Sequence, residues 1–574
     1  MLPLLPLSVP DFNTDIGDPA AALLPRRPVT EILMADAIMD GVAGWIRDCI
    51  TGNGHNGCVY NGKPRLPTRV LDVESLPEYM IRLHPTGPDE IEDYAALSYC
   101  WGGPQPLTAS DSNLEELIHG IEVSALPLTL QDAVLVTRRL GFRYLWIDAL
   151  CIIQDNYRDK LNEIGKMGKI YRNATITIVA SYSGAASRGF LTPSLDLNNT
   201  KSCTLPFHVP GSEQNGTVTI CTEANGKRPI QPLSTRGWAY QEAVLSPRLV
   251  TFSESEIYCE CHRHNPMVFN SGNRRHIPSG RLYAPDLRLL ADVQEARRDH
   301  GDGWMDVTYL AEIWENAIVQ FTLRALTVPD DRLPGVQGLA NEVAEHLGNG
   351  VGGIYLAGTW TGCLPRLLLW SRSDVPPMDL QLWDADGNFD PKLAAQQRTR
   401  SQRAPSWSWA SLDCPIRFFS DEGDRYDAMV SVVTDPTLYL NSVALSPLAG
   451  SDVGKLDMLE LECGVLERTS QQVTEDKASG RVRIAMDLEL EDDTVHEDIN
   501  THYLFLSKNY GPDGWDVDIK PKGPLYLWYS SGLVVSEIAE GLFTRVGYFR
   551  WDYDGDSAVE DEHGPLVRRT VRLI

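Results

Sequence analysis

The chain has 574 residues, 43% of them hydrophobic and 22% charged, which is typical of a globular protein of two to four domains. It carries 51 basic and 78 acidic residues, giving a formal net charge of -27 and a pI near 4.8. This charge repels phosphate backbones and anionic membrane surfaces, so we expect no nucleic-acid partner.

The sequence also predicts no membrane span, because it contains no run of about 18 apolar residues. The apolar start, residues 1–12, is interrupted by prolines and has no preceding basic residue, unlike a secretory signal. We therefore expect a cytoplasmic protein. Its 11 cysteines are scattered along a long chain, which favours buried, reduced thiols over a disulfide framework.

The first 90 residues are rich in Pro, Gly and Asp and predict an irregular extension with a short helix around residues 31–49. From residue 94 onward, short apolar runs alternate with amphipathic stretches at helical spacing. The predicted elements are a strand at 94–100, a helix at 130–140 that stops at Gly141, a strand at 142–148, a helix at 161–171 and a strand at 174–181. This order implies right-handed crossovers and a parallel sheet.

After an insertion, residues 182–233, the pattern predicts a helix that ends before Pro247 and two further strands. Four domains follow from these patterns. They are the irregular extension of residues 1–90, an α/β core of residues 91–265, a helical connector of residues 266–402 and a β-rich C-terminal domain of residues 403–574.

Candidate binding residues follow the first two predicted strands of the core. Trp101, Gly102 and Gly103 come directly after the first strand, where a parallel α/β sheet opens its ligand crevice. Glycines there let backbone amides approach a phosphate, and the indole could stack on a nucleotide base. Asp148 ends the second strand at the same edge, where it could bind a ribose. An Asp at this position also caps turns, and a tryptophan at a turn is often simply buried.

The strongest catalytic candidate is Glu242, four residues after Trp238 on the last predicted helix of the core. At this spacing the two side chains share one helix face. A carboxylate beside an aromatic ring can hold a sugar and stabilise positive charge that develops on it. We expect Glu242 to face an open pocket at the ligand-binding edge; the alternative is a solvated glutamate or an ion pair with Arg236. We predict no metal site, because the Cys and His run at residues 259–264 matches no common zinc spacing.

Four blocks of this core resemble the heterokaryon incompatibility (HET) domain of fungal proteins. The blocks are YAALSYCWGG, LPLTLQDAVLVTRRLGFRYLWIDALCIIQDN, MGKIYRNATITIVAS and RGWAYQEAVLSPRL, and QRAPSWSWASLD resembles a segment that commonly follows that domain. The resemblance implies a role in nonself recognition that ends in programmed death of fused cells.

The order of elements is also similar, more distantly, to the Toll/interleukin-1 receptor (TIR) domain. SYCW resembles its first-strand box, WIDALC its second-strand acidic box, and Trp238 with Glu242 its third-helix signature. This similarity implies a TIR-like or flavodoxin-like parallel sheet and an NAD hydrolase activity in which Glu242 helps to break the nicotinamide–ribose bond. NAD would be a substrate, and no cofactor would be required.

Three functions are compatible with the sequence. The first is a cytoplasmic HET protein that consumes NAD, activated by self-association or by a partner protein. The second is a non-catalytic TIR-like assembly module that recruits an effector and does not need Glu242. The third is an enzyme of specialised metabolism that uses the HET fold on a small organic substrate.

Overall fold

The computed structural model describes residues 11–13, 18–23, 33–52, 62–192, 200–210, 215–223, 231–253, 257–262, 264–269, 275–276, 303–347, 353–364, 366–373, 403–418, 443–446, 458–468, 472–473, 475, 482–486, 501–512, 525–540, 542–552 and 567–574. The chain divides into two compact units, one of residues 1–292 with 337–342 and one of residues 293–336 with 343–574. The division into four domains stays a prediction.

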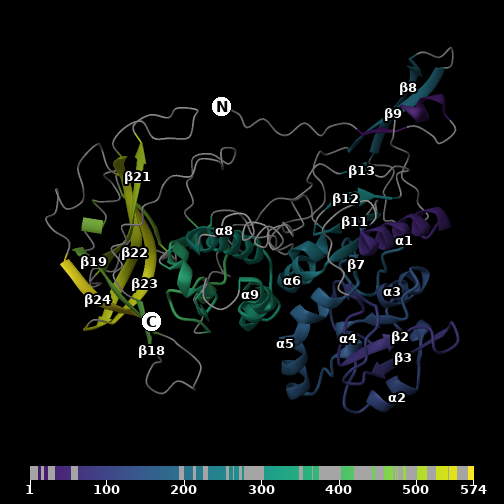
Figure 1. Cartoon of the computed structure of the whole chain (residues 1–574), viewed down its shortest axis with the longest axis horizontal. Helices are drawn as coiled ribbons and strands as arrows, with labels where there is room; N and C mark the ends of the chain where they lie inside the picture. The colour runs from purple at the N-terminus through teal and green to yellow at the C-terminus, as the bar shows by residue number, and fades with distance from the viewer. Residues whose placement is uncertain are drawn as a thin grey trace. The chain divides into compact units, whose positions relative to one another are not determined.

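The first unit is an α/β structure, and Figure 1 labels many of its elements, among them β7, α5 and α6. In chain order they are β1 Asp11–Asn13, η1 Pro19–Ala22, α1 Asp36–Thr51, β2 Arg69–Asp72, β3 Met80–Pro85, β4 Tyr94–Ser98, α2 Leu114–His119, β5 Ile121–Glu122, η2 Val123–Ala125, α3 Leu128–Arg139, β6 Tyr144–Trp146, α4 Asp148–Cys151, α5 Tyr157–Asn173, β7 Ile176–Ala180, β8 Thr200–His208, β9 Asn215–Glu223, η4 Pro232–Thr235, α6 Gly237–Leu245, β10 Arg248–Phe252, β11 Ile257–Cys261, β12 His264–Val268 and β13 Arg275–His276.

A ten-stranded sheet forms the centre of this unit, in the order β13-β12-β11-β10-β7-β4-β6-β2-β3-β5. Strands β10, β7, β4 and β6 are parallel to one another, which confirms the predicted α/β core. Numbered along the chain, these four strands have the order 2-1-3-4, as in flavodoxin-like sheets. In that order successive strands are added on opposite sides of β4, so the strand order switches between β4 and β7, and a ligand crevice is expected at the carboxyl ends of these two strands.

The sheet is mixed because antiparallel strands extend both sides of the parallel centre. On one side β2 pairs with β6 and β3 pairs with β2, so residues 69–85, assigned from the sequence to an irregular extension, belong to the main sheet. Both strands are short and lie among Pro and Gly residues, which hid their periodicity. On the other side β11 pairs antiparallel with β10. The predicted insertion contains β8 and β9, which pair with each other and, through β9, with β1 in a separate three-stranded sheet.

Two glycines of α5 allow a matched test of helix packing. A Cβ atom on Gly168 would lie 2.7 Å from the Cα atom of Gly338, whereas one on Gly165 would meet nothing within 4 Å. Gly168→Ala should therefore lower the free energy of unfolding by about 2 kcal/mol through overpacking. Gly165→Ala should raise it by about 0.5–1 kcal/mol, because alanine favours the helix. Denaturant unfolding of both variants would measure this difference, and equal effects would contradict the close helix contact.

The second unit combines helices with a β-rich part, in agreement with the predicted C-terminal β-rich region. Its elements are α8 Gly303–Thr322, η5 Pro329–Arg332, α9 Pro334–Leu347 apart from the residues that belong to the first unit, β14 Tyr355–Leu356, β15 Thr359–Trp360, η6 Thr361–Cys363, η7 Arg366–Leu368, β16 Trp370–Arg372, η9 Trp409–Ser411, β17 Ile416–Phe418, β18 Val443–Ser446, β19 Met458–Arg468, β20 Val482–Met486, β21 Thr501–Pro512, β22 Leu525–Ala539, β23 Leu542–Asp552 and β24 Val567–Leu573.

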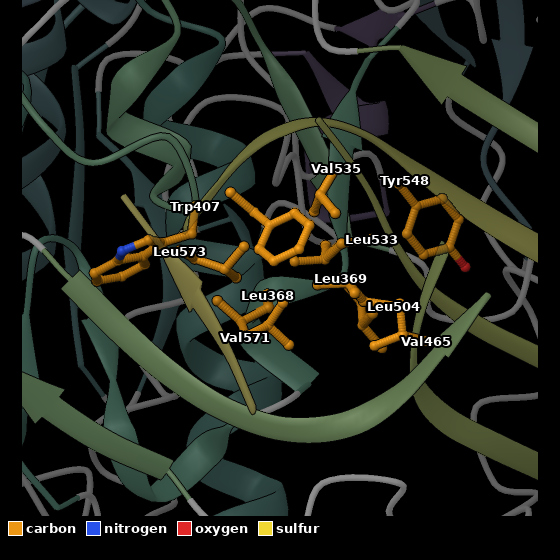
Figure 2. Packing of buried hydrophobic residues seen from close by; sticks show 11 residues of the cluster. Leu368, Leu369, Trp407, Val465, Leu504, Leu533, Val535, Tyr548, Val571 and Leu573 are labelled. Atoms are coloured by element: carbon orange, nitrogen blue, oxygen red, sulfur yellow. The ribbon is translucent and has the colours of Figure 1, made fainter. Parts of the chain in front are cut away.

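Strand β24 closes five strands of the second unit into a ring, because it pairs with both β19 and β23. Apolar side chains fill the interior, as Figure 2 shows for residues such as Leu504, Leu533 and Val571. Leu368 and Trp407, which precede these strands in the chain, join the same cluster. No helix within the described ranges is long and apolar enough to cross a membrane.

Candidate functional site

Strand β4 carries Ser98 to the carboxyl edge of the central sheet. All five residues of this strand are buried, and side chains alternate between the two faces of a strand, so Tyr94 and Ser98 share one face. On that face the hydroxyl of Tyr94 donates a hydrogen bond of 2.5 Å to the carbonyl of Ile170 in α5. Ser98 therefore lies on the face of the sheet that α5 covers.

Helix α6 holds Trp238 and Glu242 one turn apart, which confirms the predicted helix. Its last turn is tied to the sheet by hydroxyl groups. Ser246 donates to the carbonyl of Glu242 at 2.6 Å, and its hydroxyl also pairs with that of Thr177 in β7 at 2.6 Å. Trp238 is partly exposed, whereas Glu242 is buried.

The carboxyl group of Glu242 lies inside the protein and is hydrogen-bonded to strand β4. The Ser98 hydroxyl donates to Oε2 of Glu242, and the residue is only 7% exposed. We expected an open pocket in front of this carboxyl group. In this conformation a ligand could reach it only after neighbouring groups move.

Burial raises the pKa of Glu242 from its ordinary value of 4.5 to about 7. The hydrogen bond from Ser98 and the guanidinium group of Arg236 favour the ionised form, and the Tyr171 hydroxyl acts in the same direction. Asp148 opposes them, since it is a second negative charge. Glu242 can therefore exchange a proton near neutral pH, as a general acid or base must.

Asp148 and Trp101 meet at the same edge, as their positions after β6 and β4 predicted. The indole Nε1 of Trp101 donates to Oδ2 of Asp148 at 2.8 Å. The amide of Ala149, the next residue in α4, donates to Oδ1 at 2.7 Å. Burial raises the pKa of Asp148, although these two donors and Arg236 partly offset the effect.

Arg236 provides the positive charge between the two carboxyl groups. It directly precedes α6 and donates to the carbonyl of Tyr99. Burial tends to lower its pKa, but the nearby carboxyl groups of Glu242 and Asp148 outweigh this, so its pKa is raised. We use the name Glu242 cluster for this set: Ser98, Tyr99, Trp101, Asp148, Tyr171, Arg236 and Glu242.

The two glycines after β4 differ in their surroundings. Gly102 has φ +70°, and a Cβ atom there would lie 2.5 Å from the Cα atom of Ala185 and 2.8 Å from the carbonyl oxygen of Gly184. Gly103 has φ +137° and nothing within 4 Å of its Cβ position. Gly102 therefore lets the loop after β4 pack against the loop after β7, whereas the space beside Gly103 is open. Their proposed phosphate-binding role stays a prediction.

The cysteines of this region are protonated thiols. Burial raises the pKa of Cys100 to about 11 and that of Cys151 to about 12, so neither is an activated nucleophile at neutral pH. Within the part of the chain that the structure describes, no group of three or more His, Cys, Asp or Glu side chains is placed to hold a metal ion.

Sequence reasoning did not assign roles to Ser98, Tyr171 or Arg236 in this cluster. For Ser98 a signal existed in the sequence, because Tyr94, Ala96 and Ser98 are spaced two residues apart and so lie on the same face of the strand. Arg236 was weighed only as a pairing partner of Glu242. Tyr171 had no signal beyond its helical spacing, because its hydroxyl turns inward to the carbonyl of Leu97 at 3.0 Å.

Comparison with known proteins gives one match. The family model of the heterokaryon incompatibility protein (HET) matches residues 94–242, from the first residue of β4 to Glu242. No curated protein and no solved structure matches the chain, so the similarity to TIR domains stays an expectation. The chain therefore contains a HET domain, and the whole Glu242 cluster lies within it.

Proposed function

We propose that this protein acts in fungal nonself recognition and programmed cell death, and that its α/β core cleaves NAD to nicotinamide and ADP-ribose. The HET domain supports the first part. The observation that carries the second is a buried carboxyl group, Glu242, with a pKa of about 7 at the carboxyl edge of the parallel strands. A cytoplasmic location and activation by self-association or by a partner protein belong to the same proposal.

The proposed reaction breaks the bond between the ribose C1′ and the nicotinamide nitrogen, and the bonding electrons leave with neutral nicotinamide. The ribose becomes an oxocarbenium-like cation, which the carboxylate of Glu242 would stabilise. Water then bonds to C1′ and loses its proton to the carboxylate or to solvent. Trp101 and Asp148 are the proposed contacts for the base and ribose, with Trp238, Gly102 and Gly103 as further binding residues.

Incubation of the purified full-length chain with NAD should release nicotinamide, and Glu242→Gln should abolish the release. Because the ionised carboxylate is required, the rate should rise between about pH 6 and about pH 8, around the pKa of about 7. Glu260→Gln is the matched control: Glu260, in β11, is also 7% exposed with a pKa raised to about 7 by burial. Equal nicotinamide release by wild type and Glu242→Gln would refute the catalytic assignment.

A non-catalytic assembly module is the second candidate, and the burial of Glu242 favours it. A carboxyl group that is 7% exposed and bonded to Ser98 can also serve to hold α6 against β4. In that case cell death would persist with Glu242→Gln, and sedimentation would show the same oligomers for both forms. Loss of cell death with unchanged oligomers would favour catalysis.

A further inference from the structure

We propose that Ser98 is a positioning residue for Glu242: it fixes the direction of the carboxyl group and favours its charged form. The kinetic part of this proposal rests on the proposed NAD cleavage, whereas its titration part does not. The contact itself joins residues 144 positions apart, so it is built by the fold and not by local chain geometry.

The donor is held rigidly. Ser98 is the last residue of β4, is 3% exposed, and lies opposite Val179 in the parallel pairing with β7. Strand β4 pairs with β6 on its other side. The backbone that carries the hydroxyl is therefore fixed by strand pairing, so Ser98 offers its donor to Glu242 from a constant position at the end of β4.

The helix backbone on the acceptor side is fixed separately. Ser246 donates to the carbonyl of Glu242, not to its carboxyl group, and Thr177 supports that hydroxyl from β7. The two serines thus hold the same residue at different atoms. Of these two contacts, only the one from Ser98 reaches the carboxyl group and can distinguish its charged from its neutral form, because a donor binds a carboxylate more strongly than a carboxylic acid.

Other groups also face the carboxyl group, and their effects have known directions. Arg236, before α6, and the Tyr171 hydroxyl, from α5, favour the ionised form. Asp148, in α4, disfavours it. Burial raises the pKa of two groups after β4, Tyr99 and Cys100, and the negative charge of Glu242 raises each of them further. Removing Ser98 and removing Asp148 should therefore shift the titration of Glu242 in opposite directions.

The test is an infrared titration of the full-length chain, with Glu242→Gln subtracted so that only the carboxyl group of Glu242 contributes. In the wild type its midpoint should lie at about pH 7. Ser98→Ala should raise the midpoint by about one pH unit, and Asp148→Asn should lower it. Ser98→Thr should keep the wild-type midpoint, and Ser246→Ala, the matched control, should leave it unchanged.

Ser98→Cys keeps a side chain of similar size but weakens the donor, so it replaces Ser98→Ala if that variant does not fold. The titration midpoint of Ser98→Cys should lie between those of the wild type and Ser98→Ala. A midpoint that is the same in wild type, Ser98→Ala and Ser98→Cys would overturn the proposal. If nicotinamide release occurs, the pH range over which its rate rises should move to higher pH in Ser98→Ala, together with the titration midpoint. If Glu242→Gln still releases nicotinamide, NAD cleavage by Glu242 fails, while the titration still decides the role of Ser98.

Discussion

Glu242→Gln should stabilise the protein at pH 8 and leave its stability nearly unchanged at pH 4. The pKa of Glu242 is raised from 4.5 to about 7 by burial, so the folded state holds this proton more tightly than the unfolded state. Ionising the buried carboxyl group therefore lowers the free energy of unfolding. The loss grows as the pH rises from about 4.5 to about 7 and is complete above that range.

A pKa rise from 4.5 to about 7 corresponds to about 3 kcal/mol at pH 8. Glutamine avoids this cost because it is neutral at every pH, and its amide oxygen can still accept the hydrogen bond from Ser98. Denaturant unfolding of both forms at pH 4, 6 and 8 would measure the effect, with hydrogen exchange of β4 and α6 reporting on the first unit. A variant less stable than wild type at pH 8 would show that the carboxylate is a net stabilising group.

This result would bear on function as well as on stability. A residue whose charged form destabilises the fold, and whose neutral replacement stabilises it, is unlike an ordinary structural ion pair. Groups held in unfavourable states are frequent at active sites, where stability is lost in exchange for activity. Stabilisation together with loss of nicotinamide release would support the catalytic role of Glu242, and stabilisation without any loss would favour the assembly module.

Gly102→Ala should destabilise the HET domain by about 3 kcal/mol or more. The residue has φ +70°, a conformation that costs a side chain about 1–2 kcal/mol. The added Cβ atom would also overlap the backbone of Gly184 and Ala185, which cannot move aside as the end of a flexible side chain can. Overpacking of this kind costs about 1–3 kcal/mol more.

Gly141→Ala is the control for this change. Gly141 has a similar positive φ, +79°, but nothing lies within 4 Å of its Cβ position, so only the backbone strain remains. Thermal unfolding should therefore show a clearly smaller decrease in Tm for Gly141→Ala than for Gly102→Ala. The hydrogen bond from Trp101 to Asp148 lies beside the loop of Gly102, and indole fluorescence should change with Gly102→Ala. Equal decreases in Tm would indicate that the two loops are not in tight contact.

The parts of this fold that follow local rules could be predicted from the sequence. Amphipathic spacing predicted the helices around residues 130–140 and 161–171, and short apolar runs predicted the strands beside them, because side-chain periodicity reflects which face is buried. The alternation of these elements implied a parallel sheet, and the ends of its strands placed Trp101 and Asp148 at one edge. Strands β2 and β3 could not be predicted in this way, since each is short and gains its stability from pairing with a distant neighbour.

By itself, then, the sequence determined the α/β core, the HET resemblance and the choice of Glu242 as the residue of interest. The tertiary structure alone decided the state of that residue: buried, bonded to Ser98, and placed with Asp148 around Arg236. The physical reason is that the pKa of a side chain depends on every charge and donor around it, whatever their separation along the chain. Those neighbours come from β4, α4, α5 and α6, and only folding brings them together.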